Sequence, residues 1–216
     1  MGRAPVRAGR RGELPGGEPP RGRAPLPALR GKLEEARSFA SQTAEVWRAQ
    51  RRSGDEGTIR CILADIHRRL GDLDAAEREA RAALDLVTLV PLEQRAAKAM
   101  LAAILLARGH TAEARAAAEY AMQRLSTLRA FGYRGAFVHL VHAEALDAAG
   151  EHAEAAAVLA AARDRMLAQA EKIPDPEMRR RFLEDIPVHA RIRELTALGA
   201  RLADRDAPTA GLRKPA

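Results

Sequence analysis

Histidine and acidic side chains are the first residues to consider for metal or acid–base chemistry. His139 and His142 lie three positions apart, so a helix would place both rings on one face, and Glu144 lies nearby but off that face. Zinc normally needs three or four protein ligands. Since no second carboxylate or cysteine completes the set, the sequence predicts no metal site. We expect the two imidazole rings to pack within a helical hairpin.

The single cysteine, Cys61, is the next candidate for chemistry, as a nucleophile with His67 as its base. A spacing of six residues puts the two side chains on different faces of a helix, and the neighbours of Cys61 are apolar. The Gly16-Gly17 pair leads into no predicted helix, so it does not form a phosphate-binding loop. We therefore expect a packed thiol, no catalytic residue, no cofactor and no enzymatic activity.

The single cysteine also bears on the compartment, because one cysteine cannot form an internal disulfide and a reducing environment is then the default. The apolar runs are too short to span a bilayer. By elimination, we expect a cytoplasmic protein with no membrane partner.

The formal net charge of +7 is typical of proteins that bind nucleic acid, so its location along the chain matters. Residues 1–30 hold seven arginines against Glu13 and Glu18, an excess of five (7 − 2), which leaves an excess of two (7 − 5) elsewhere. This stretch is rich in Gly, Pro and Arg and predicts a disordered tail, as do residues 206–216. The basic tail either contacts RNA, DNA or acidic lipid, or is a solvated or mistakenly translated stretch. We favour the second interpretation.

Four short segments repeat along the rest of the chain, each with a glycine followed five positions later by an alanine. The glycines lie 40, 38 and 41 residues apart. Glycine ends a helix well because the left-handed backbone conformation costs it little, and alanine lets two helices approach closely. The repeat therefore predicts helical hairpins. Its defining residues are Gly31, Ala36, Gly71, Ala76, Gly109, Ala114, Gly150 and Ala155.

Apolar residues at helical spacing predict an all-α fold. The expected helices are 32–52, 58–70, 73–88, 91–108, 111–127, 132–149, 152–172, 176–186 and 188–204. A half repeat and three hairpins would stack over residues 31–172. The last two helices leave the repeat pattern, and we expect residues 173–205 to cap the end of the stack.

The glycine-to-alanine segments resemble the tetratricopeptide repeat family over about residues 31–172. They depart from its usual pattern, because the repeats are near 40 residues rather than about 34 and the aromatic positions are mostly replaced by Ala, His and Leu. Repeats of this length are similar to those in large bacterial signalling and transcriptional regulators, where they follow a kinase, cyclase or nucleotide-binding module. The closing segment of such proteins is similar to residues 175–189, through Arg181, Phe182, Leu183, Glu184 and Pro187.

The resemblance implies a right-handed α-solenoid that acts as a protein-interaction scaffold in bacterial signalling or regulation. Two alternatives stay open. The chain could be a regulator that contacts nucleic acid through its basic tail, or the C-terminal fragment of a larger kinase- or ATPase-type regulator.

Stacked repeats usually bind their partners on the inner, concave face. An apolar centre flanked by charge on that face suits an amphipathic helix or an extended peptide. The alternative is that the charges are solvated and the apolar residues pack inside the stack. The residues expected on this face are Asp65, Arg68, Arg69, Ala99, Ala103, Leu106, Phe137, Leu140, Glu144 and Asp147.

The helix after Gly31 should lack a hairpin partner, because prolines in residues 15–30 prevent a preceding helix. Its apolar face would then be partly uncovered and would mark an interface with a second copy or an upstream domain. The alternative is that the helix at 58–70 covers it. The residues of this face are Leu33, Ala36, Phe39, Ala40 and Trp47.

Overall fold

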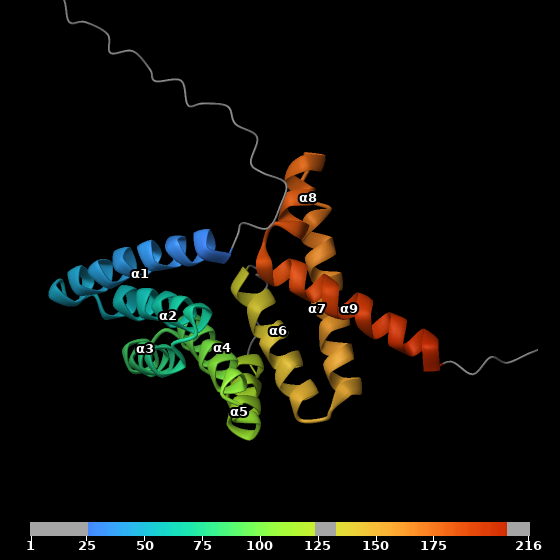
Figure 1. The fold of residues 1–216 in the computed structure, drawn as a ribbon, viewed down its shortest axis with the longest axis horizontal. Helices are drawn as coiled ribbons and strands as arrows, with labels where there is room; N and C mark the ends of the chain where they lie inside the picture. The colour runs from blue at the N-terminus through green and yellow to red at the C-terminus, as the bar shows by residue number, and fades with distance from the viewer. Residues whose placement is uncertain (1–25, 124–132, 207–216) are drawn as a thin grey trace, which may run out of the picture.

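The structure is a computed structural model that describes residues 26–123 and 133–206. Within these ranges the chain forms nine α-helices and no strand, so the predicted all-α class is confirmed (Figure 1). No helix among them is both long and apolar enough to cross a membrane. The helices are α1 (Leu26–Ala49), α2 (Ser53–Leu70), α3 (Leu73–Leu86), α4 (Pro91–Ala107), α5 (Thr111–Met122), α6 (Tyr133–Ala148), α7 (His152–Ala170), α8 (Pro176–Glu184) and α9 (Pro187–Asp206).

Three hairpins, α2–α3, α4–α5 and α6–α7, follow one another and pack side by side (Figure 1). The same turn joins the helices of each hairpin. Gly71, Gly109 and Gly150 have φ angles of 86°, 79° and 84°, a left-handed conformation that a β-carbon would disfavour. The turn is closed by backbone hydrogen bonds such as Asp72 N–H to His67 O, at 3.0 Å.

The repeat-defining alanine of each of the three hairpins is buried. Ala76 and Ala114 are fully buried, and Ala155 is 3% exposed. Ala76 and Ala114 pack in one apolar cluster with side chains of α4, including Ile104. A methyl group suits these positions because a larger side chain would push the helices apart.

The helix that was predicted to begin at residue 32 begins earlier, so Gly31 does not lie at a helix boundary. It lies within α1, which begins at Leu26 and therefore includes residues 26–30 of the predicted tail. No β-carbon at Gly31 would meet a neighbour within 4 Å, and its φ is not positive. A side chain could therefore be accommodated at Gly31, unlike at the three turn glycines, whose φ angles are positive.

The apolar face of α1 is partly covered by α2. Ala40 and Ala44 are buried against Ile59 and Leu63, whereas Phe39 remains 72% exposed. Leu33 and Trp47 are partly buried in the same cluster, and Ala36 is exposed. Thus α2 covers one stripe of this face and leaves Phe39 uncovered, and the interface stays a prediction.

The C-terminal helices pack across the end of the last hairpin. Asp175 caps α8 by accepting a hydrogen bond of 2.7 Å from the Met178 backbone N–H. α9 lies against α6 and α7, where Val188 and Ile192 join a buried cluster that includes Leu140 (Figure 1). The remaining predictions, of tails over residues 1–25 and 207–216 and of helix at 124–127 and 132, fall outside the residues that the structure describes.

Candidate functional site

The first helices of the three hairpins, α2, α4 and α6, line two hollows that adjoin each other. We call the first the central hollow. It has a volume of about 280 Å³ and is completed by the start of α9. Its lining residues are Asp65, Arg68, Arg69, Met100, Ala103, Phe137, Leu140, Val141, Glu144, Pro187, Val188 and Arg191.

The second, which we call the apolar hollow, has a volume of about 360 Å³. Its lining residues are Thr58, Cys61, Ile62, Asp65, Ile66, Glu93, Ala96, Met100, Arg134 and Phe137. Both hollows share Asp65, Met100 and Phe137, so they form one continuous surface. We refer to the two together as the inner groove.

The inner groove brings together most of the residues that the sequence analysis expected on the concave face. Seven of them line the central hollow, namely Asp65, Arg68, Arg69, Ala103, Phe137, Leu140 and Glu144. They meet because three parallel-stacked helices each present side chains three or four residues apart on one face.

Three expected residues lie elsewhere. Ala99 is fully buried against Ala121 and Val138, so it is closed to a partner. Leu106 packs into two core clusters, and Asp147 is exposed with its carboxylate 2.7 Å from His152 Nδ1. The expectation for Ala99 is wrong because α4 has neighbouring helices on several sides, which leaves little of its surface for the groove.

Arginines outnumber carboxylates in the central hollow. Asp65 accepts hydrogen bonds from Arg68, the shorter at 2.7 Å, and also pairs with Arg69 at 2.7 Å. On the other side, Arg191 of α9 lies 3.5 Å from the carboxylate of Glu144. Burial raises the pKa of Glu144 above its ordinary value, against the opposing effect of Arg191. Arg191 also pairs with Glu194 at 2.9 Å, so the three guanidinium groups have three carboxylate partners.

The apolar hollow has one side bounded by an ion pair. Arg134 pairs with Glu93, which also accepts a hydrogen bond of 3.3 Å from the Thr58 hydroxyl. These three residues were not predicted, because their side chains meet only once α2, α4 and α6 are stacked. The apolar walls had a signal in the sequence, since Ile62 and Ile66 belong to the apolar stripe of α2.

Cys61 lies in the wall of the apolar hollow and packs against the core of the stack. Burial raises the pKa of its thiol to about 12. A thiol with such a pKa is a poor nucleophile near neutral pH. The His67 ring lies 3.7 Å from the carboxylate of Asp72. The geometry agrees with a packed thiol.

His139 is buried in the hairpin of α6 and α7, with both ring nitrogens engaged. Nδ1 lies 2.8 Å from the Gly135 carbonyl, and Nε2 accepts a hydrogen bond of 2.9 Å from Arg165. Burial lowers the pKa of His139, and that of His142 in the same way. Among the residues that the structure describes, no three His, Cys, Asp or Glu side chains converge as metal ligands would.

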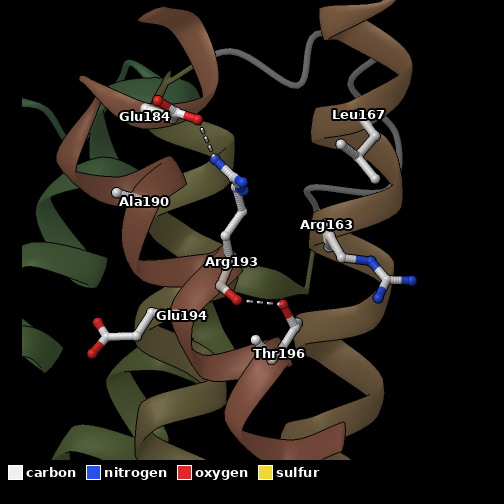
Figure 2. A pocket seen from close by; sticks show the side chains of 8 residues that line it. Arg163, Leu167, Glu184, Ala190, Arg193, Glu194 and Thr196 are labelled. Carbon is white, nitrogen blue, oxygen red and sulfur yellow. Dashed lines mark hydrogen bonds and ion pairs between the residues drawn. The ribbon is translucent and has the colours of Figure 1, made fainter. Parts of the chain in front are cut away.

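A third hollow, of about 570 Å³, lies between α7 and the C-terminal helices and shares no residue with the inner groove (Figure 2). The charged side chains along it have partners within the chain. Arg193 pairs with Glu184 at 3.5 Å, and Arg163 turns away toward Asp164, at 2.9 Å. This hollow therefore presents no converging set of polar groups.

Comparison with known proteins supports the repeat assignment. The family model for the tetratricopeptide repeat matches residues 58–82, 95–119 and 136–161. Neither a curated protein nor a solved structure matches the chain. Each matched segment begins in the first helix of a hairpin and ends in its second. The chain is thus an α-solenoid of helical hairpins over the residues that the structure describes, and the three matches support a likeness to the tetratricopeptide repeat family.

Proposed function

We propose that the chain is a non-enzymatic scaffold that holds a segment of another protein in the inner groove. Tetratricopeptide repeats generally mediate interactions between proteins, and stacked repeats present a long surface for this purpose. The observation that carries the proposal is the pair of adjoining hollows along α2, α4 and α6, with an apolar floor and charged flanks. Binding sites of this size and composition suit side chains of a partner.

We also propose the setting in which the scaffold works. The repeat spacing near 40 residues and the likeness of residues 175–189 to the closing segment of bacterial regulators support a role in bacterial signalling or regulation. In this setting the partner is a protein that takes part in the same regulatory pathway, and the last two helices close the stack.

The test is an unbiased peptide-display selection on the full chain, followed by binding measurements on two matched variants. Ile62→Glu places a charge in the apolar hollow, at a side chain that is 48% exposed. Val46→Glu places the same charge on α1, at a side chain that is 52% exposed and outside the groove. Both positions are β-branched residues inside helices, so the two changes should cost similar stability.

Selected peptides should bind the parent chain and Val46→Glu equally and should lose binding to Ile62→Glu. Circular dichroism of both variants should show the same helix content as the parent. Peptides that bind all three proteins alike would place the binding surface outside the groove and overturn the proposal.

A further inference from the structure

The first helix lies at one end of the stack and has one buried side and one open side. Among the described residues, α1 packs extensively against α2 and against no other helix (Figure 1). Ala40 and Ala44 face α2, and they point about a third of a turn away from Phe39 and Val46. Phe39 is 72% exposed and Val46 is 52% exposed. The contact with α2 therefore leaves an adjacent side of α1 uncovered.

The residues of this open side have the spacing of a helix–helix seam. Their positions are separated alternately by four and three residues, which keeps the side chains on one line where two helices meet. We call this set the open stripe, and it consists of Lys32, Ala36, Phe39, Thr43, Val46 and Gln50. Thr43 already donates its hydroxyl to the Phe39 carbonyl at 2.8 Å, so a helix that covers the stripe does not leave this hydroxyl unpaired.

The spacing of the open stripe is the same in both chain directions, so the stripe is complementary to itself in an antiparallel pair. A two-fold axis at the level of Ser41 places Phe39 opposite Thr43 of a second copy. The same axis places Ala36 opposite Val46 of the second copy. Each contact joins a larger side chain to a smaller one, which allows the two helices to approach closely.

Charge favours the same direction. In the antiparallel pair, Lys32 lies opposite the neutral Gln50 of the second copy. In a parallel pair, identical residues meet, so Lys32 would face Lys32 and the bulky Phe39 would face Phe39. Like charges that face each other oppose association. The open stripe therefore fits a second copy of itself in the antiparallel direction.

We propose that the chain forms a two-fold symmetric dimer in which the α1 helices of two copies pack antiparallel along their open stripes. The inner groove lies along α2, α4 and α6, so it stays open in each copy. The dimer presents two grooves, which raises its affinity for a partner that carries two binding segments. The dimer itself does not depend on what the groove binds.

The length of the seam sets the expected strength of the dimer. Lys32 and Gln50 lie 18 positions apart in the sequence, which is about 27 Å along a helix at 1.5 Å per residue. Two helices in contact over this length make an interface near or below the lower limit of about 1,200 Å² for stable specific complexes. We therefore expect a dimer that dissociates on dilution in the micromolar range.

The test measures the mass of the full chain by sedimentation equilibrium from about 1 µM to about 500 µM. The average mass should rise from 23.4 kDa towards twice that value. Phe39→Glu should weaken the dimer at least about tenfold, since it places a charge in the centre of the seam. The matched control is Met178→Glu on α8, where the side chain is 64% exposed, and it should leave the dimer unchanged. Circular dichroism should show the parent's helix content in both variants.

Two cysteine variants test the direction of the helices, in a Cys61→Ala background that removes the native thiol. Lys32→Cys and Gln50→Cys place thiols at opposite ends of the open stripe. In an antiparallel dimer neither variant brings its own two thiols together, whereas a mixture of the two variants does. A short bismaleimide should therefore crosslink the mixture and neither variant alone.

Each result decides the proposal. A parent chain that keeps the monomer mass up to about 500 µM would refute the dimer. Equal dissociation in Phe39→Glu and Met178→Glu would place the interface elsewhere and overturn the inference. Crosslinking of each cysteine variant with itself would show a parallel pair and refute the antiparallel arrangement. Val46→Glu should lose the dimer and still bind groove peptides like the parent, so the dimer and the proposed function can fail separately.

Discussion

Gly57 of α2 packs closely against the end of α3 and the residue that follows it, which allows a test of the packing. A β-carbon built at this position would lie 2.4 Å from Val87 Cγ1 and 3.3 Å from the Ala83 carbonyl oxygen. Val87 is 1% exposed and β-branched, so it has few alternative rotamers to move into. Gly57→Ala must therefore push α2 away from the end of α3.

The expected size follows from two opposing effects. Glycine to alanine inside a helix ordinarily stabilises by about 1 kcal/mol, and overpacking a well-filled core costs about 1–3 kcal/mol. Gly57→Ala should therefore lower the free energy of unfolding by up to about 2 kcal/mol. Gly54, on the same helix, has no atom within 4 Å of its built β-carbon. Gly54→Ala should therefore gain the helix-stabilising effect of alanine without a packing cost. The two variants should differ by about 1–3 kcal/mol.

Urea unfolding followed by far-ultraviolet circular dichroism measures this difference directly. A second substitution, Val87→Ala, removes the methyl groups that the new β-carbon would meet. In that background Gly57→Ala should lose its penalty, which appears as a coupling free energy of at least about 1 kcal/mol in the double-mutant cycle. If Gly57→Ala proves as stable as Gly54→Ala, the close approach of the two helices is wrong.

Three further predictions concern the rest of the fold. Burial lowers the pKa of His139 below its ordinary value of 6.5. As the pH falls, this histidine is therefore protonated in the unfolded chain at a higher pH than in the folded chain. Stability should be full above pH 6.5 and fall as the pH drops through the lowered value, and a plot of unfolding free energy against pH should be flatter in His139→Gln. Gly109→Ala should cost about 1–2 kcal/mol because its φ is 79°, with Gly109→Asn closer to the parent in thermal unfolding. A chain truncated at Pro174 loses the helices that bury Leu140, so its melting temperature should fall, and an unchanged melting temperature would refute the capping role.

Much of the fold could be predicted because each signal is local. Three repeats pair a glycine at the turn with an alanine in the following helix, and both positions act through contacts within one hairpin. Gly31 shows the limit of such reasoning. Its segment has the same residue types, yet Gly31 lies within α1 and not at a turn between two helices. The glycine-to-alanine pattern indicates where a left-handed turn is possible, and the packing of the helices decides whether the turn forms.

The residues of the inner groove also fall into those that the local sequence could place together and those that it could not. Residues on one helix, such as Asp65 and Arg69, could be placed together because four positions along a helix return to one face. Pairs formed between helices, such as Arg134 with Glu93, had no signal, since their meeting depends on how the hairpins stack. The prediction that Ala99 lies on the concave face was wrong for a related reason, because neighbouring helices cover α4 at this position.

The start of α9 has a double role that ties the groove to the end of the stack. Val188 lines the central hollow and also packs in the buried cluster with Leu140, while Arg191 supplies one of the three arginines. The groove is therefore complete only while α9 is docked on α6 and α7. A segment held in the central hollow binds the docked state alone, so by mass action it must stabilise the docking of α9. Partner binding and closure of the stack are then one coupled equilibrium, and substitutions at Val188 should weaken both together.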